Sequence, residues 1–348
     1  MKKKFAIDCS KLNILEKSGT HRFLVGFLNE LTKNKNYQFT FFYKDFDSDL
    51  NQFPFINRGE VKILGNKLMY TQIQLLKELN NYDLFLFPWQ TLPFLGFGSR
   101  AKKLAVIHDT GFSVKTKLFT FLTQLTSDKL FSVSFYTAKK LVRSSVVISE
   151  GVDDSVFYKI PSKDLKILKE KNSVPEYFIL SLGRIENRKN IYNNLRAFNR
   201  VHKFFPKLKY VFIGQFVESE EDIYSFIDSL KIPRENILFK KYISDYELNI
   251  FLNCMEFMVF TPLEEGFGLP VIEAYSVEKP VILSRIEALA EFKLSANQYV
   301  DSSNDSDIAT TIINLLKKSD SMIYSRQYKR ILDKFSWKNS VDNFINNI

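Results

Sequence analysis

The chain has 348 residues, 45% of them hydrophobic and 25% charged, which is typical of a soluble globular protein with room for two domains. Its formal net charge of +10 makes nucleic acid, anionic lipid and an anionic substrate candidate partners. The charges are scattered along the sequence, and it has no zinc-ligand spacing, no aromatic RNA-binding motif and no obvious recognition helix. We therefore expect no nucleic-acid partner.

The cysteines and the N-terminal residues bear on the cellular compartment. Cys9 and Cys254 lie far apart in the sequence and form no metal-binding or redox motif, which favours a reducing environment. The first residues resemble the start of a signal peptide, but Asp8 and Lys11 interrupt the apolar run too early for one. No stretch of the sequence approaches the length of an apolar membrane span. We expect a cytoplasmic protein.

Short apolar runs alternate with helical patterns along the chain, which predicts a parallel α/β architecture. Near the N-terminus, residues 21–33 carry an apolar stripe at helical spacing. The strands expected in the first half are 5–8, 39–43, 61–64, 84–87, 104–107, 130–133 and 146–148. Those expected in the second half are 178–182, 210–213, 237–239, 258–260, 281–283 and 299–300.

The two halves are separated by residues 153–175, which are rich in Lys, Asp and Ser and show no strand pattern. We therefore predict an N-terminal domain over residues 1–160 and a C-terminal domain over residues 161–336. A last helix is expected over residues 337–348, with Ser336 as its cap.

A glycine and several cations follow the strand predicted at 178–182, where the sequence reads Ser-Leu-Gly-Arg-Ile-Glu-Asn-Arg-Lys-Asn. Gly183 allows a tight turn, the planar guanidinium of Arg184 can hold phosphate oxygens, and Lys189 adds a mobile charge. A solvated basic loop would have the same composition, and these residues alone do not decide between the two interpretations.

The most informative stretch is 265–273, Glu-Gly-Phe-Gly-Leu-Pro-Val-Ile-Glu, which follows the apolar run 257–262. Pro270 suits the first turn of a helix, where its missing N–H costs nothing. Gly266 and Gly268 let backbone N–H groups approach a ligand closely, and the start of a helix favours a phosphate. The pattern predicts a second anion site at the end of a strand, where open α/β sheets bind their ligands.

Two carboxylates flank this turn, and sugar hydroxyls are a chemical reason for acids beside an anion site. Glu265 and Glu273 can each accept hydrogen bonds from paired hydroxyl groups. The two anion sites and these acids together predict a nucleotide-sugar pocket. The alternative is an ordinary glycine turn, with Glu264 and Glu265 in a solvated loop and Glu273 favoured by the helix dipole.

The two stretches resemble the family 4 retaining glycosyltransferases, also described as glycosyl transferases group 1. That family typically carries Gly-Arg-x4-Lys-Asn followed by Glu-x7-Glu around Glu-Gly-Phe-Gly-Leu-Pro. The first motif matches residues 183–190 here, and the second matches residues 265–273. Further segments that match in order are 240–248, 279–284 and 335–337. The resemblance covers nearly all of the C-terminal half and is looser in the N-terminal half.

The resemblance implies the GT-B architecture, in which two Rossmann-like, doubly wound domains face each other across a cleft. The N-terminal domain would bind the acceptor and the C-terminal domain the nucleotide sugar. The last helix, 337–348, would cross back to the first domain.

The resemblance also implies roles for the residues of the C-terminal half. Glu273 would bind the ribose hydroxyls, and Glu265 would lie nearer the donor sugar. The groups expected to stabilise the departing diphosphate are Arg184, Lys189 and the backbone amides of Gly266, Phe267, Gly268 and Leu269, beside the turn at Gly183. With two cations and the start of a helix available to the diphosphate, a divalent metal is unnecessary, so we expect neither a metal nor another cofactor.

In the N-terminal half, the resemblance implies that His108 contacts the donor sugar and that Gly19 belongs to a loop near the diphosphate or the acceptor. A lone histidine after a strand is more often structural, and Asp109 could either orient His108 or stabilise the turn. Two residues depart from the family pattern. Glu150 replaces an asparagine, and Glu278 replaces a glycine.

These observations predict a retaining glycosyltransferase that moves a hexosyl group from a UDP- or GDP-sugar to a saccharide or lipid-linked acceptor, in the biosynthesis of a cell-surface polysaccharide or lipopolysaccharide. Because relatives often use lipid-linked acceptors, the positive charge suggests association with the anionic inner face of the cytoplasmic membrane; an effect on solubility alone is the other interpretation. A nucleotide-sugar epimerase, a sugar phosphorylase and a non-catalytic polyanion-binding module remain alternatives.

Overall fold

The computed structural model describes residues 2–12, 19–45, 53–65, 69–89, 91–110, 114–241, 243–317 and 322–348. The chain divides into two compact units, which we call the N-terminal unit (Met1–Gly151 with Phe335–Ile348) and the C-terminal unit (Val152–Lys334). The sequence placed the corresponding boundaries at residues 160 and 336.

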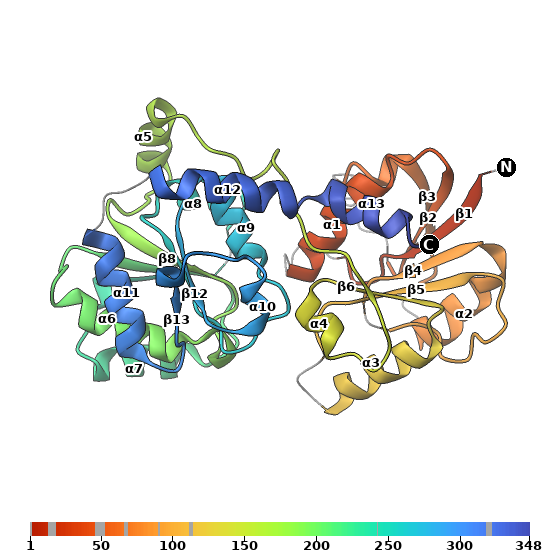
Figure 1. Cartoon of the computed structure of the whole chain (residues 1–348), viewed down its shortest axis with the longest axis horizontal. Coiled ribbons are helices and arrows are strands. Elements are labelled where there is room, and N and C mark those ends of the chain that lie inside the picture. Colours follow the sequence, from red (N-terminus) through yellow and green to blue (C-terminus); the bar gives the residue numbers. More distant parts are fainter. Residues whose placement is uncertain are drawn as a thin grey trace. The chain divides into compact units, whose positions relative to one another are not determined.

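The N-terminal unit contains a parallel sheet of seven strands in the order β3-β2-β1-β4-β5-β6-β7 (Figure 1). The order reverses between β1 and β4, as in doubly wound folds. Buried runs such as Leu-Phe-Leu-Phe in β4 are typical of parallel strands that are covered on both faces. The strands are β1 (Lys3–Asp8), β2 (Tyr37–Tyr43), β3 (Gly59–Ile63), β4 (Leu84–Phe87), β5 (Lys102–Ile107), β6 (Lys129–Ser132) and β7 (Val146–Val147).

The C-terminal unit contains a parallel sheet of six strands in the order β10-β9-β8-β11-β12-β13, which reverses between β8 and β11. Helices α6 and α11 lie on one side of its strands, and α9 and α10 lie on the other (Figure 1). The strands are β8 (Phe178–Leu182), β9 (Lys209–Ile213), β10 (Ile237–Lys240), β11 (Met258–Phe260), β12 (Val281–Ser284) and β13 (Tyr299–Val300). The predicted α/β class with two doubly wound parallel sheets is confirmed, and each predicted strand is present.

Most helices of each unit lie between its strands in the sequence, whereas α5 precedes the first strand of the C-terminal unit and α11, α12 and α13 follow its last strand. In the N-terminal unit they are α1 (Gly19–Leu31), α2 (Leu75–Glu78), α3 (Val114–Thr126), α4 (Phe135–Lys139) and α13 (Trp337–Ile345). In the C-terminal unit they are α5 (Ser162–Lys171), α6 (Ile191–His202), α7 (Glu220–Ser229), α8 (Asp245–Cys254), α9 (Leu269–Ser276), α10 (Glu287–Ala290), α11 (Asp305–Lys317) and α12 (Met322–Lys334). Within the described ranges, no helix is both long and apolar enough to cross a membrane.

Helix α13 packs on α1, so the end of the chain forms part of the N-terminal unit. Its cap is Ser336, whose Oγ accepts a hydrogen bond from the N–H of Asn339 at 3.3 Å, which confirms the predicted cap. Phe344 is fully buried, and its ring lies 5.2 Å from that of Phe27 and 4.5 Å from that of Phe131. These aromatic contacts hold the last helix against the first sheet.

Candidate functional site

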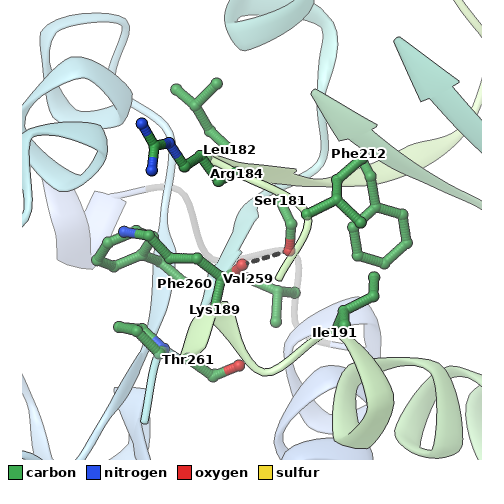
Figure 2. Close-up of a pocket in the computed structure, with 12 residues that line it drawn as sticks. Ser181, Leu182, Arg184, Lys189, Ile191, Phe212, Val259, Phe260 and Thr261 are labelled. Carbon is green, nitrogen blue, oxygen red and sulfur yellow. Dashed lines mark hydrogen bonds between the residues drawn. The ribbon is translucent and has the colours of Figure 1, made fainter. Parts of the chain in front are cut away.

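The candidate site lies where β8 and β11, neighbours at the reversal of strand order, reach their carboxyl ends. The segment after β8 provides Gly183, Arg184 and Lys189 to a pocket, and the end of β11 and the residues after it provide Phe260 and Thr261 (Figure 2). The segment after β8 is one of the two anion sites predicted from the sequence, and the other, residues 265–273, follows β11 a few residues beyond the pocket. The sheet topology brings them together at the position where open α/β sheets bind ligands.

The two segments are joined by an ion pair between Lys189 Nζ and the carboxylate of Glu265. Lys189 belongs to a 3₁₀ turn that follows β8, and its amine also lies 5.1 Å from the ring centroid of Phe260. The side chains of Lys189 and Glu265 are 18% and 16% exposed, so water only partly screens the pair. A cation and an acid expected in one site are thus in direct contact.

Arg188 adds a second connection, which the sequence interpretation did not include. Its guanidinium lies 2.8 Å from Glu186 Oε1 and donates a 3.1 Å hydrogen bond to the carbonyl of Glu264. The carbonyl of Arg188 accepts a 2.9 Å hydrogen bond from the N–H of Leu263. The signal was present in the sequence, because Arg188 belongs to the same basic run as Arg184 and Lys189.

Glu265 is held in its charged form by these neighbours. Burial alone would raise the pKa of its carboxyl, but the charge and hydrogen bond of Lys189, the charge of Arg188 and the N–H of Gly266 together outweigh burial and lower the pKa. The Gly266 N–H donates to Glu265 Oε1 at 3.2 Å. One of the amides expected to hold a diphosphate is therefore directed at a carboxylate in this structure.

Arg184 is exposed and lines the pocket. Figure 2 shows its guanidinium and the amine of Lys189 on the same side of the pocket. Two cations that project to one side of a partly enclosed space can hold an anionic group between them.

Pro270 lies in the first turn of helix α9, as the sequence predicted. The helix begins one residue earlier, at Leu269, and its N-cap is Gly268. Gly268 has φ +115°, a conformation that side chains with a Cβ rarely adopt, and a Cβ there would also lie 2.9 Å from Leu289. The side chain of Phe267 is buried and its ring lies 5.6 Å from that of Phe292. The turn therefore offers a ligand its backbone rather than its side chains.

Glu273 lies on the second turn of α9 and is 2% exposed. The described residues that line the pocket include neither Glu265 nor Glu273. Glu265 contacts Lys189, which does line the pocket. The role of Glu273 at ribose hydroxyls stays a prediction.

Polar side chains that are buried or partly buried hold these segments in place, and the sequence interpretation missed them. Thr261 donates a 2.6 Å hydrogen bond to Asn194 Oδ1 of α6, and Ser284, the last residue of β12, donates a 2.5 Å bond to the carbonyl of Pro262. Ser181 donates to the carbonyl of Val259 at 2.7 Å (Figure 2). Their signal is weak, because a single polar residue in an apolar run has many explanations.

Asn190 and Gly214 also fix the segment after β8. Asn190 is buried with φ +66°, and its amide donates a 2.7 Å hydrogen bond to the carbonyl of Ser302. At Gly214, directly after β9, a Cβ would lie 2.0 Å from the carbonyl oxygen of Gly183. Only glycine allows the two turns to approach so closely. The sequence contained one sign of this close approach, because Gly214 directly follows the strand predicted at 210–213.

His108, in the N-terminal unit, is held by neighbours from its own unit. Its Nε2 lies 3.0 Å from the carbonyl oxygen of Pro88, and its Nδ1 lies 3.8 Å from Glu150 Oε1. The ring of Phe23 packs edge-on at 4.7 Å. These contacts support the structural interpretation of His108, and its contact with a donor sugar stays a prediction. They also show that Glu150, which departs from the family pattern, faces His108.

Gly19 is the first residue of α1 and is exposed, while the preceding Ser18 lies outside the described residues. The role expected for Gly19 at a diphosphate or an acceptor is therefore a prediction on which the structure gives no contact. In the part of the chain that the structure describes, no group of three or more His, Cys, Asp or Glu side chains is arranged to hold a metal ion.

Comparison with known proteins gives a family match within the C-terminal unit. Residues 163–331 match the family described as "Glycosyl transferases group 1". This range contains both motifs of the candidate site and confirms the resemblance that the sequence indicated.

Two curated relatives are mannosyltransferases of Escherichia coli. The serotype-specific mannosyltransferase WbdA is 27% identical over 175 residues, which cover 47% of this chain and 22% of WbdA. The O-antigen chain mannosyltransferase B is 24% identical over 235 residues, which cover 66% of this chain and 60% of that protein. The chain thus spans about a fifth of the first relative and less than two thirds of the second.

Among solved structures, Anabaena Alr3699/HepE in complex with UDP-glucose has a TM-score of 0.81 at 14% identity, covering 99% of this chain and 100% of that one. At this identity the similarity shows a shared fold. It extends over both units, including the N-terminal unit that the family match does not reach.

Proposed function

We propose, on the premise that residues 163–331 form a glycosyl transferases group 1 domain, that this protein is a retaining glycosyltransferase. It would move a hexosyl group from a nucleoside diphosphate sugar to a saccharide or lipid-linked acceptor. The observation that carries the proposal is the contact between Lys189 and Glu265, which joins the two motifs beside a pocket at the carboxyl ends of β8 and β11.

The donor is proposed to be a UDP- or GDP-sugar. Arg184 and Lys189 would hold the diphosphate together with the backbone amides at the start of α9, Glu273 would bind ribose hydroxyls, and Glu265 would lie beside the sugar. The HepE structure contains UDP-glucose, which supports a nucleotide sugar as the class of donor. The mannosyltransferase names of the two relatives support a hexose as the sugar.

The proposed chemistry follows from charge. The bond between the anomeric carbon and the diphosphate oxygen breaks, the acceptor oxygen bonds to the same face of that carbon, and the acceptor proton passes to the departing phosphate. Negative charge grows on the leaving group, where fixed cations and amides stabilise it. Because Arg184 and Lys189 line the pocket, we propose that this stabilisation needs no divalent metal and no other cofactor.

The proposed setting is the synthesis of a cell-surface polysaccharide or lipopolysaccharide in the cytoplasm, at the inner face of the cytoplasmic membrane. The name of the O-antigen chain mannosyltransferase supports this setting.

A thermal-shift panel of UDP, GDP, ADP and their sugars with the full chain tests the donor site. A ligand that binds only the folded protein at a hundredfold excess over its Kd adds about 2.7 kcal/mol of stability. We expect a uridine or guanosine diphosphate to raise Tm, Arg184→Ala to reduce that shift, and Lys203→Ala, an exposed cation outside the site, to leave it unchanged.

The same ligands added with EDTA test metal independence, which predicts an unchanged shift. Incubation of the selected donor alone, with analysis of the sugar, separates a transferase from an epimerase, which would convert the donor without an acceptor. A panel in which no nucleoside diphosphate or its sugar raises Tm would contradict the proposed donor site.

A further inference from the structure

Helix α3 of the N-terminal unit has its apolar side turned outward. Val114, Leu118, Phe121 and Leu125 are 85%, 55%, 44% and 52% exposed. At 3.6 residues per turn these four positions lie within an arc of roughly 60°. We call this set the apolar face of α3. In Figure 1 the helix lies along the outer edge of the N-terminal unit (yellow).

The opposite, polar side of α3 is buried and fixed by hydrogen bonds. Gln124 is 5% exposed, and its Oε1 accepts a 2.8 Å bond from the N–H of Val142. Thr120 and Thr123 are also buried. At the end of the helix, the guanidinium of Arg143 donates to the carbonyls of Gln124 and Ser127. These contacts fix the rotation of the helix about its axis. Because the polar side is held inward, the apolar face points to solvent.

Two segments that contact α3 also carry exposed apolar side chains. The ring of Phe94 stacks at 5.9 Å on that of Phe119, on the helix, and two other residues of the Phe94 loop, Leu95 and Phe97, are 77% and 71% exposed. On the other side, Val142, whose N–H binds Gln124, is 68% exposed. Exposed apolar groups of this extent usually mark an interaction surface.

The stretch of sequence that contains α3 is strongly positive. Residues 100–149 contain nine Lys or Arg and two Asp or Glu, so they carry +7 of the net charge of +10. The expectation that the charges are scattered is therefore wrong for this segment. On α3 itself, the exposed Lys115 and Lys117 lie to either side of the apolar face at 3.6 residues per turn. No acidic residue occurs between residues 110 and 127.

We propose that the apolar face of α3 docks on the surface of an anionic phospholipid bilayer. Apolar side chains between flanking lysines match such a surface, where the apolar groups enter the acyl boundary and the ammonium groups reach anionic headgroups. A second copy of this chain fits less well, because a symmetric contact would place two basic segments against each other.

The length of the helix fits this arrangement. Its 13 residues give about 20 Å, shorter than the roughly 30 Å hydrocarbon core of a bilayer, so the helix would lie in the plane of the membrane surface. Docking through α3 would bring the N-terminal unit, in which the acceptor is expected to bind, to the membrane.

Vesicle co-sedimentation of the full chain tests the proposal. We expect the protein to bind vesicles of phosphatidylcholine with phosphatidylglycerol, and to bind vesicles of phosphatidylcholine alone more weakly. The double variant Leu118→Ser, Phe121→Ser should lose about tenfold or more in binding. The matched control is Ile167→Ser, Phe204→Ser, two side chains of the C-terminal unit that are 66% and 68% exposed, and it should bind like the parent.

A charge variant provides a second readout that does not depend on apolar substitutions. Lys115→Gln, Lys117→Gln should weaken binding to the anionic vesicles by roughly fivefold for each lysine and should reduce its salt dependence. The control Lys163→Gln, Lys166→Gln removes two exposed lysines from α5. Unchanged Tm in all variants shows that the fold persists.

Three results would overturn the proposal: no binding of the parent to anionic vesicles, equal binding to neutral and anionic vesicles, or equal binding of parent and α3 variants. Light scattering tests whether a second copy of the chain occupies this face instead. If the parent is a dimer and the Leu118→Ser, Phe121→Ser variant is a monomer, the apolar face of α3 is a contact between copies. Vesicle binding needs no nucleotide sugar, so its failure and a failure of the proposed transferase activity are distinguishable.

Discussion

Lys189 and Glu265 neutralise each other across the ends of two neighbouring strands, and the second oxygen of Glu265 accepts the Gly266 N–H. The carboxylate of Glu265 thus binds the same cation and the same amide that are expected to bind a diphosphate. A diphosphate that binds at Lys189 must displace the carboxylate or share the cation with it. In the proposed site, Glu265 therefore competes with the nucleotide and assists the sugar.

This competition predicts opposite effects on binding and transfer. Glu265→Gln should tighten binding of the nucleoside diphosphate alone by about fivefold, because Lys189 is released from its partner. Transfer from the nucleotide sugar should fall at least about tenfold, because the contact to the sugar is weakened. Titration calorimetry and a transfer assay measure the two quantities.

Glu235→Gln, a charge-matched change at an exposed position of the same unit, is the control and should alter neither quantity. Weaker binding of the diphosphate to Glu265→Gln would show that the carboxylate does not compete for Lys189.

Removing the cation should destabilise the C-terminal unit in a pH-dependent manner. In Lys189→Met, burial of Glu265 is no longer offset by its main partner, so we expect a loss of about 1–3 kcal/mol of unfolding free energy at pH 7. The pKa of Glu265 is lowered in the folded parent, so the pair stabilises the fold above the unfolded-state pKa of about 4.3 and this contribution is lost on acidification.

The difference between parent and Lys189→Met should therefore shrink as the pH falls below about 4, where Glu265 becomes protonated. Urea unfolding followed by circular dichroism at several pH values measures it. A difference that stays constant with pH would mean that Lys189 stabilises the fold through its packing on Phe260 rather than through Glu265.

The strands could be predicted because each is a short apolar run, and a buried parallel strand needs no more than that. No strand boundary differs from its predicted position by more than two residues. The two motifs of the site were also visible, since glycines and charged residues directly follow strands. The sequence could not show that Lys189 pairs with Glu265, because 76 residues separate them and only the sheet order makes them neighbours.

Helix α3 shows a second limit of sequence reasoning. Its periodicity alone would place Leu118, Phe121 and Leu125 in the core, because an apolar stripe normally faces inward. The structure has the reverse orientation, set by Gln124 and by the hydrogen bonds at residues 142 and 143. Contacts between distant segments decided the orientation, and a local pattern does not contain them.

Asp8 gives the N-terminal unit a pH dependence of its own. This last residue of β1 is 1% exposed, and burial raises its pKa to about 6, although the Ser10 hydrogen bonds and the charges of Lys11 and Lys44 oppose the rise. A raised folded-state pKa means that Asp8 favours folding below the unfolded-state pKa of about 3.9 and that this benefit disappears as the pH rises through 6.

Asp8→Asn should therefore gain stability relative to the parent between pH 4 and pH 7, by up to about 3 kcal/mol at 1.36 kcal/mol per pKa unit. Both tryptophans of the chain, Trp89 and Trp337, belong to the N-terminal unit, so intrinsic fluorescence during urea unfolding reports this unit. Asp164→Asn on the exposed helix α5 is the control. A parent and an Asp8→Asn variant with parallel pH profiles would contradict the prediction.

Glu278 occupies a position where the family pattern has glycine. The backbone at this position is in the left-handed conformation, which favours glycine. Its φ is +59°, and the next residue, Lys279, donates its N–H to the carbonyl of Ala274 at 3.0 Å, which closes the end of α9. A residue with a Cβ in this left-handed conformation costs roughly 1–2 kcal/mol. The ion pair of Glu278 with Lys159 is half-exposed and offsets little of that cost.

Glu278→Gly should therefore stabilise the C-terminal unit by about 0.5–1 kcal/mol, after the greater chain entropy of unfolded glycine is subtracted. Lys159→Ala, which removes the ion pair and leaves the backbone unchanged, should have an effect within about 0.5 kcal/mol. Calorimetric unfolding of both variants measures the difference. If Glu278→Gly instead lowers Tm by as much as Lys159→Ala does, the ion pair rather than the backbone conformation determines the stability of this turn.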